Sequence, residues 1–170
     1  EKRNALRYIA KKIGKKVKVI LDFPEHAREA NINRLSLQEE DENIEILEKI
    51  DIKEWIWHFK HSDFVATDSF HGTCFSIIFK KNFVAFANER RGSERVQTLL
   101  QPIGIADRLL FEYNQSIPDE FLDNPIDYEK VYASMEDEKR FSMEWLKEAI
   151  FSPKKSKGFR VYDVESEATR

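Results

Sequence analysis

The sequence predicts an α/β fold in which a Rossmann-like parallel sheet carries helices on both of its faces. Short apolar runs of strand length alternate along the chain with segments of helical periodicity, an order that is typical of a parallel sheet. The strand-like runs are rich in apolar and β-branched residues, as expected for strands that are buried on both faces. We therefore expect a single domain over residues 1–151, followed by a polar tail at residues 152–170.

In the first part of the chain, a helix is followed by two strands. Apolar residues recur at helical spacing over residues 2–12, and Gly14 is placed to end that helix. The run at 16–21 alternates and then becomes apolar, which predicts a strand, and the short run at 44–47 predicts a second strand. The polar stretch between them, residues 23–43, is expected to be a loop.

The middle of the chain alternates helices and strands more clearly. A helix with Asp51 as its N-cap is predicted from four apolar residues at i, i+3, i+4 and i+7 spacing, which are Ile52, Trp55, Ile56 and Phe59. Residues 63–67 predict a strand, and residues 72–81 predict a short helix that is apolar nearly all round and therefore buried on most sides. Residues 82–88 predict the next strand.

The last third of the chain is expected to be mostly helical. Ser93 is placed to cap a helix that ends near Pro102, and residues 104–110 predict a turn or a short helix. Residues 114–124 are expected to form a loop. Asp127 is placed to cap a long final helix.

Composition and charge exclude several classes of protein. The formal net charge of −3 argues against a general nucleic-acid binder. No apolar run approaches the roughly 20 residues of a membrane span. Cys74 is the only cysteine, so neither a disulfide within the chain nor a cysteine-based metal site is possible, and a cytoplasmic location fits. Because the chain begins at Glu1, inside a predicted helix, we expect it to be part of a longer protein.

The segment "TDSFHG", residues 67–72, joins a predicted strand to a predicted helix. In an open parallel sheet, ligands bind outside the carboxyl ends of the strands. The amides of the first helical turn and the helix dipole favour an anion there, and Gly72 is expected to let a ligand approach the backbone. His71 stands beside that position with a side chain that exchanges a proton near neutral pH. Asp68 and Ser69 are expected mainly to support the loop and cap the helix.

Two other interpretations of this segment are weaker. A serine hydrolase elbow has the pattern G-x-S-x-G, whereas Ser69 is flanked by Asp68 and Phe70. A metal site would have His71 and Asp68, but no third ligand stands at a recognisable spacing. The chain also lacks G-x-G-x-x-G and P-loop motifs, so no nucleotide cofactor is expected. The remaining histidines have no comparable setting, and His58 and His61 are expected on the surface of their helix.

The segment "NERRGSER", residues 88–95, adds basic side chains at the same edge of the predicted sheet. It follows a strand and precedes a helix, so it opens where the 67–72 segment opens. The forked guanidinium groups of Arg90, Arg91 and Arg95 suit the oxygens of a phosphate. The alternative is a solvated basic turn. Together, the two segments favour a transferase that handles an anionic donor.

The run "SDFVATDSFHGTCFSIIFKKNF", residues 62–83, followed by Asn88, Arg91-Gly92, Arg95 and Leu99-Leu100, resembles the core signature of the polysaccharide pyruvyl transferase family. The resemblance covers roughly residues 44–150 and extends more weakly to Arg108-Leu109 and "IDYEKV". It implies transfer from phosphoenolpyruvate to a sugar, giving a pyruvate ketal across two hydroxyls. It also implies a fold similar to the two-lobed GT-B glycosyltransferases, of which this chain would be the C-terminal lobe.

The resemblance also implies which residues act. His71 matches the family's histidine and is expected to be the general acid or base. Some members carry arginine where this chain has Ser69, so donor binding must depend on other groups, with Arg91 and Arg95 as candidates. The residues expected to bind substrate are Ser69, Phe70, Gly72, Thr73, Asn88, Arg91 and Arg95. The implied partners are the phosphoenolpyruvate donor, a saccharide acceptor and the N-terminal lobe of the same protein; no metal or cofactor is implied.

Two rival functions belong to other classes. A nucleotide-sugar glycosyltransferase lobe would use the same helix-start chemistry for a diphosphate, but no acidic residue is clearly placed to bind a ribose. A non-catalytic interaction domain would use the long last helix, with Trp145 and Leu146, and the charged tail. Packing of that helix on its own lobe or on the other lobe is the expected alternative.

Overall fold

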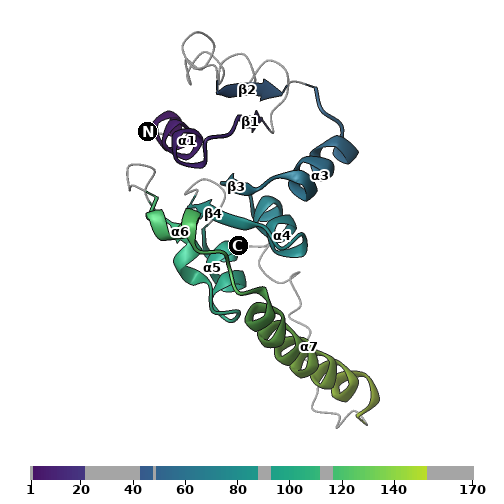
Figure 1. Cartoon of the computed structure of the whole chain (residues 1–170). Helices are drawn as coiled ribbons and strands as arrows, with labels where there is room; N and C mark the ends of the chain where they lie inside the picture. Colours follow the sequence, from purple (N-terminus) through teal and green to yellow (C-terminus); the bar gives the residue numbers. More distant parts are fainter. Residues whose placement is uncertain (1, 22–42, 48, 88–92, 112–116, 153–170) are drawn as a thin grey trace, which may run out of the picture. The chain divides into compact units, whose positions relative to one another are not determined.

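The computed structural model describes residues 2–21, 43–47, 49–87, 93–111 and 117–152 (Figure 1). The chain divides into two compact units, of which the first ends at Met135 and the second begins at Glu136. The predicted loop at 23–43, apart from its last residue, and the predicted tail after Ser152 lie outside the described residues. The domain boundaries drawn from the sequence stay predictions.

The strands of the first unit form two parallel sheets. One sheet pairs β1 (Val17–Ile20) with β2 (Ile44–Leu47). The other has the order β3-β4-β5, with β3 at Phe64–Thr67, β4 at Asn82–Phe86 and β5 at Leu109–Leu110. Every pairing is parallel, as predicted, but the described strands lie in two sheets rather than in the single sheet expected. Strand β5 was not predicted as a strand.

The helices follow the predicted order, with two differences. Their bounds are α1 (Lys2–Ile13), α3 (Ile52–His61), α4 (Phe70–Ile78), α5 (Glu94–Leu100), the 3-10 helix η1 (Ala106–Arg108), α6 (Asp119–Asp123) and α7 (Tyr128–Phe151). Helix α4 begins two residues before the predicted start. Helix α6 lies where a loop was predicted, because five residues are too few to show helical periodicity.

Strand β4 lies between two apolar cores. Phe83 and Ala85 belong to a core that includes buried residues of α3, α4, α5 and α7. Val84 and Phe86 belong to a second core, which includes buried residues of α1 and α6. Successive side chains of a strand point to opposite faces of its sheet. Helices therefore cover both faces of the β3-β4-β5 sheet, which confirms the predicted α/β architecture.

The helix ends predicted at Gly14, Asp51 and Asp127 are confirmed, whereas the one at Ser93 is not. Asp51 caps α3, with its Oδ1 accepting from Glu54 N at 2.8 Å, and Asp127 Oδ1 accepts from Lys130 N at 3.2 Å in the first turn of α7. Gly14 follows α1 with φ +67°, a conformation that glycine adopts at little cost. The prediction for Ser93 is wrong: it precedes α5 in a helical conformation, and its side chain makes no capping bond.

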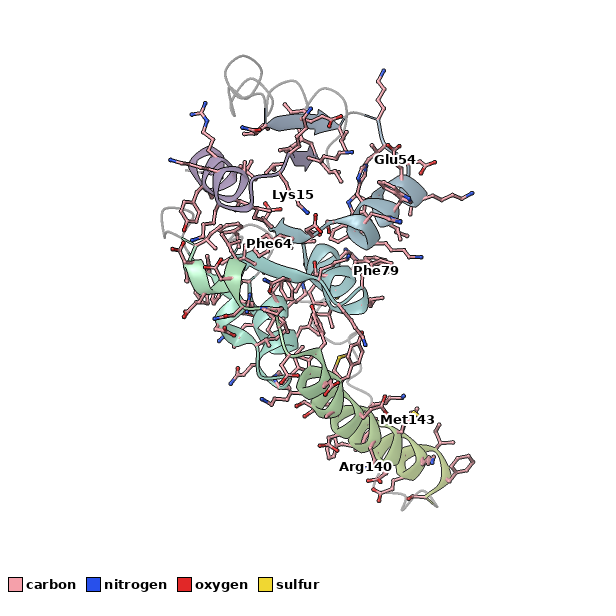
Figure 2. All side chains as sticks on the ribbon, in the orientation of Figure 1. Lys15, Glu54, Phe64, Phe79, Arg140 and Met143 are labelled. Carbon is pink, nitrogen blue, oxygen red and sulfur yellow. The ribbon has the colours of Figure 1, made fainter. Side chains whose placement is uncertain are left out.

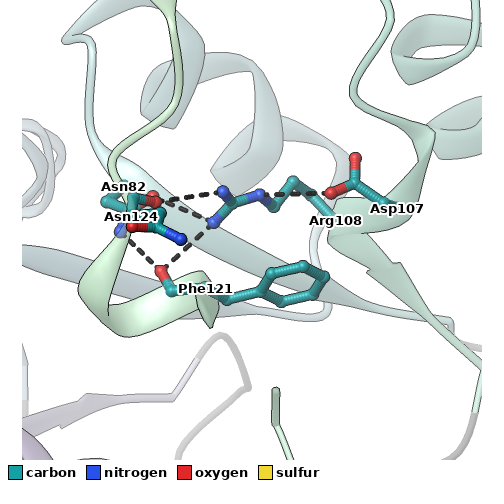
Figure 3. A network of polar contacts seen from close by, with 5 residues as sticks. All are labelled: Asn82, Asp107, Arg108, Phe121 and Asn124. Carbon is teal, nitrogen blue, oxygen red and sulfur yellow. Dashed lines mark hydrogen bonds and ion pairs between the residues drawn. The ribbon is translucent and has the colours of Figure 1, made fainter. Parts of the chain in front are cut away.

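A buried arginine joins the first residue of β4 to α6 (Figure 3). Arg108 Nη1 donates to Asn82 Oδ1 at 2.9 Å and to Phe121 O at 3.2 Å, while Nη2 donates to Asn124 O at 3.3 Å. The guanidinium carbon lies 4.4 Å from the centroid of the Phe121 ring. Burial lowers the pKa of this guanidinium, and Asp107 opposes that effect. The short α6 is thus held by contacts from distant parts of the chain.

The described part of the second unit is the part of α7 from Glu136 to Phe151, together with Ser152. Every residue from Glu136 to Ser152 is exposed, including the apolar side chains of Phe141 and Trp145. Figure 2 labels Arg140 and Met143 in this part of the helix. Among the described helices, none is both long and apolar enough to cross a membrane.

Candidate active site

Two segments of the chain leave the sheet at the same edge. Strands β3 and β4 run parallel, with Thr67 paired to Ala85. The segment that follows Thr67 and the segment that follows Phe86 therefore both begin at the carboxyl ends of the strands. This is the edge at which open α/β sheets bind ligands.

The side chain of Thr67 organises the first of these segments. Its Oγ1 accepts a hydrogen bond from Ser69 N at 3.1 Å. An ideal Cβ built on Gly72 would lie 2.2 Å from the same oxygen, so only glycine fits there. Gly72 is itself buried. The sequence argument that Gly72 admits a ligand therefore needs correction, because the close approach is made by Thr67.

Ser69 caps helix α4, as the sequence predicted. It has an extended backbone conformation, and its Oγ accepts from Gly72 N at 3.4 Å. Its carbonyl oxygen accepts from Thr73 N at 2.9 Å and from Thr73 Oγ1 at 3.1 Å. Thr73 is fully buried at 0% exposure. Ser76 is buried on the same side of the helix, and its Oγ donates to Gly72 O at 2.8 Å. Ser69 thus engages the amides of both Gly72 and Thr73.

The amides that remain at the start of α4 are those of Phe70 and His71. No hydrogen bond to another described residue occupies either of them. The four first amides of a helix have no partner within the helix, and those that no cap engages are available to a ligand. The anion donors expected from the sequence therefore shift by two residues, from the amides of Gly72 and Thr73 to those of Phe70 and His71.

His71 and Arg95 both lie against Phe70. The His71 side chain is exposed, and its ring meets the Phe70 ring edge-on with 6.0 Å between centroids. Arg95, in the first turn of α5, places its guanidinium carbon 5.4 Å from the centroid of the Phe70 ring. This contact brings the start of α5 beside the start of α4. A cation, an imidazole and two amides without partners in the described chain thus gather at one end of the sheet.

Several other predicted residues contribute less or lie elsewhere. Asn88, Arg90 and Arg91 lie outside the described residues, so their placement stays a prediction. Cys74 is half-buried, and burial raises the pKa of its thiol, as in a packed rather than a reactive cysteine. Within the described ranges, no three His, Cys, Asp or Glu side chains gather in a way that could hold a metal ion.

The surface prediction holds for His61 but not for His58. The His58 side chain is only 13% exposed and lies 3.9 Å from Glu54 Oε1. On a helix, residue 58 is one step of 100° from the buried Phe59, which places it at the border of the buried face. His58 is therefore part of the packing of α3.

Sequence reasoning missed Thr67 as an organiser of this site. The available signal is a threonine two residues before a capping serine, since Ser and Thr hydroxyls often accept the amide two positions later. The motif drew attention to Asp68, Ser69 and His71 instead. Asp68 is half-buried at the same turn.

Comparison with known proteins supports the family identified from the motif. The family model for polysaccharide pyruvyl transferase matches residues 1–90, which is more than half of the 170 residues. The match contains the whole segment from Thr67 to Thr73 and ends before Arg91 and Arg95. It extends further toward the start of the chain than the resemblance seen in the sequence and does not reach its later part. Neither the search of curated proteins nor the search of solved structures found a match. By the extent of the family match, the chain belongs to the polysaccharide pyruvyl transferase family.

Proposed function

We propose that this chain is the donor-binding lobe of an enzyme that transfers the pyruvyl group of phosphoenolpyruvate to two sugar hydroxyls, forming a ketal during cell-surface polysaccharide synthesis. The observation that carries this proposal is the position of His71. Its exposed imidazole stands in the first turn of α4, beside two amides without partners in the described chain, inside the segment that the family model matches.

The start of α4 suits the phosphate and carboxylate groups of the donor. The Phe70 and His71 amides and the positive end of the helix dipole favour an anion at this position. Arg95 is the described cation that lies beside them, since its guanidinium rests on the Phe70 ring. Guanidinium groups pair well with phosphate oxygens. Arg91 and Asn88 remain further candidates from the sequence. Some members of the family have an arginine at the position of Ser69, and we propose that Arg95 replaces that arginine here.

The chemistry of ketal formation assigns a role to His71. One sugar hydroxyl adds to C2 of the enol, C3 takes up a proton to become a methyl group, and the bond from C2 to the phosphate oxygen breaks. The second hydroxyl then adds to C2 and closes the ketal. One donor and one diol yield one ketal and one inorganic phosphate. The two hydroxyls lose one proton each, which matches the proton that C3 takes up and the proton that leaves with phosphate. These transfers need a general acid and base, and we assign that role to His71 because histidine is the side chain that most often serves in it.

The acceptor side belongs to a second lobe in this proposal. The parallel sheet with helices on both faces supports a comparison with one lobe of a GT-B transferase. The sugar would then lie between this lobe and the N-terminal lobe of the same protein. The identity of the sugar therefore depends mainly on residues of that other lobe.

The test compares His71→Ala with His61→Ala in the full-length protein. His61 is also an exposed histidine, but it lies at the end of α3. Loss of a general acid–base group lowers turnover by about 10²–10⁴-fold, so we expect that loss for His71→Ala alone, measured as phosphate release and as ketal signals in the product. Circular dichroism checks that both variants are folded. Near wild-type turnover of His71→Ala would exclude this role for His71.

A second measurement separates the proposal from a glycosyltransferase. Calorimetric titration of the full-length protein with phosphoenolpyruvate and with nucleotide sugars compares the two donor classes directly. We expect binding of phosphoenolpyruvate. Binding of a nucleotide sugar alone would replace pyruvyl transfer by glycosyl transfer at the same helix start.

A further inference from the structure

We propose that Thr67 is a positioning residue for pyruvyl transfer, because its hydroxyl determines where the first turn of α4 begins. The inference rests on the proposed function and concerns a residue outside the set expected to touch substrate. Thr67 acts on the reaction through Ser69, and not by contact with the donor.

Thr67 is well suited to serve as a fixed reference point. It is the last residue of β3, and its backbone is held by the parallel pairing with Ala85 of β4. Strand β4 lies in the middle of the sheet, with Phe83 and Val84 at 0% exposure. Close-packed surroundings of this kind deform little. The Thr67 side chain therefore transmits the position of the sheet to the loop that follows it.

Hydrogen bonds at the buried side of the first turn connect Thr67 to α4. Thr67 Oγ1 accepts a hydrogen bond from Ser69 N, and Ser69 in turn accepts hydrogen bonds from the amides of Gly72 and Thr73. Gly72 and Thr73 are both buried, so this set of bonds faces the protein interior. Among the described residues at this turn, the groups left for a ligand are the amides of Phe70 and His71 and the exposed imidazole of His71. The Thr67 hydroxyl thus selects which donors of the first turn stay available.

Contact of Thr67 with Gly72 adds a second constraint. The Thr67 side chain fills the space that a Cβ on Gly72 would occupy, which sets how close the helix lies to the strand. Valine has nearly the shape of threonine and keeps this contact, but it cannot accept the Ser69 amide. Serine keeps the hydroxyl and loses only the methyl group. The two substitutions therefore separate the hydrogen bond from the packing.

Loss of the hydroxyl should affect the chemical step more than donor binding. A reacting group that moves by about 1 Å can cost up to about 100-fold in rate. An interaction that matters only in the transition state lowers kcat, whereas a loss of ground-state binding raises KM. A purely structural threonine would lower thermal stability in Thr67→Val without this separation of kcat from KM.

The experiment measures steady-state phosphate release by the full-length enzyme for Thr67→Val, Thr67→Ser and Thr98→Val. Thr98 is an exposed threonine of α5 whose hydroxyl donates to Glu94 O at 2.8 Å, so its replacement by valine removes the same atom away from the site. We expect kcat of Thr67→Val to fall by about tenfold or more, with the donor KM changed by less than about threefold. Thr67→Ser and Thr98→Val should retain kcat within about threefold of wild type.

Amide hydrogen exchange of Ser69 provides a readout that does not need substrate. Exchange at Ser69 should be faster in Thr67→Val than in wild type or in Thr67→Ser, because the amide has lost its acceptor. If folded Thr67→Val turns over like wild type, or if folded Thr67→Ser loses as much activity as Thr67→Val, the positioning role is wrong. If the valine variant does not fold, the serine variant is judged against wild type alone: a kcat of folded Thr67→Ser that is about tenfold or more below wild type would overturn the role of the hydroxyl.

The outcome also distinguishes this inference from the proposed function. Wild-type enzyme that releases no phosphate from phosphoenolpyruvate would overturn the proposed function and the positioning role with it. Active wild-type enzyme with an equally active Thr67→Val variant would overturn the positioning role alone.

Discussion

Thr67 Oγ1 lies where any residue larger than glycine at position 72 would place its Cβ. An ideal Cβ built on Gly72 would be only 2.2 Å from this oxygen. Gly72→Ala should therefore be destabilising, because either β3 or the first turn of α4 has to shift. Overpacking of a buried site of this kind costs about 1–3 kcal/mol, and we expect that loss in urea denaturation.

A double variant provides the control for the Gly72 prediction. Thr67→Ala removes Oγ1 but leaves the Thr67 Cβ position, which lies 3.0 Å from the ideal Cβ. Gly72→Ala should then cost less in the Thr67→Ala background than in wild type, a coupling that a double-mutant cycle measures. Equal costs in the two backgrounds would mean that Thr67 is not the obstacle.

Arg108→Leu should destabilise the first unit strongly. The variant leaves Asn82 Oδ1 and the carbonyl of Asn124 without this donor at a site where Arg108 is only 7% exposed. Unsatisfied buried polar groups cost about 1–3 kcal/mol each, so we expect a total of about 3 kcal/mol in the free energy of unfolding, measured by urea denaturation.

Arg140→Leu is the matched control for Arg108→Leu. Arg140 pairs with Asp137 at 2.8 Å on an exposed part of α7. Exposed ion pairs contribute about 0–1 kcal/mol, so this variant should be close to wild type. Similar losses in both variants would contradict the assignment of Arg108 as the buried link between β4 and α6.

Tyr128 should retain its proton at a pH where ordinary tyrosines lose theirs. Burial raises the pKa of its phenol, whose hydroxyl donates to Lys81 O at 2.5 Å. Because the folded pKa lies above the unfolded value of about 10, this contribution to stability is complete below pH 10 and is lost as pH rises further. Tyr128→Phe should therefore weaken the decline of stability above about pH 10.

The measurement for Tyr128 is an ultraviolet titration of native and denatured protein, combined with urea denaturation at several alkaline pH values. Native wild type and native Tyr128→Phe should ionise the same number of tyrosines in the ordinary range, because Tyr128 keeps its proton there. After denaturation, wild type should ionise one more tyrosine than Tyr128→Phe. An identical pH dependence of stability in wild type and Tyr128→Phe would contradict the prediction.

Asp51→Ala should cost more stability than Ser93→Ala, although both residues precede a helix. Asp51 accepts the Glu54 amide, whereas Ser93 makes no capping bond. Loss of a working N-cap costs about 1 kcal/mol, so Asp51→Ala should lower the thermal midpoint while Ser93→Ala changes it little. The order of the two midpoints is the decisive observation; a larger effect at Ser93 would contradict it.

The parts of the fold that the sequence predicted are those with local signals. The apolar run of β4 is buried from Phe83 to Phe86, so its composition alone predicted the strand. The stripe from Ile52 to Phe59 identified α3, and Asp51 marked its start. At the candidate site, the strand-to-helix junction placed His71 at a helix start, and parallel pairing placed the carboxyl ends of β3 and β4 at the same edge. These predictions needed only periodicity, capping residues and the topology of parallel sheets.

The parts that could not be predicted depend on distant contacts. Strand β5 has two residues, and it is a strand only because Leu109 and Leu110 pair with Ala85 and Phe86. Helix α6 is stabilised by Asn82 and Arg108, which lie outside it. The contact of Arg95 with Phe70 likewise joins two helices and has no local signal. The earlier start of α4 follows from the Ser69 cap, which sequence reasoning recognised without using it to place the helix boundary.

The carboxyl end of α4 is completed by residues that are synthesised much later. The hydroxyl of Tyr132 donates to Ile77 O, which lies 55 positions earlier in the chain, and that of Tyr128 donates to Ser76 O, 52 positions earlier. Contacts of such long sequence separation form late and slow the folding of a domain. During translation, α4 therefore leaves the ribosome with these two carbonyls bonded only to the nearby amides of Lys80 and Lys81. The tyrosine hydroxyls are added only when the start of α7 follows. A nascent chain that stalls before Tyr128 would present an incomplete core to the chaperones of the cell.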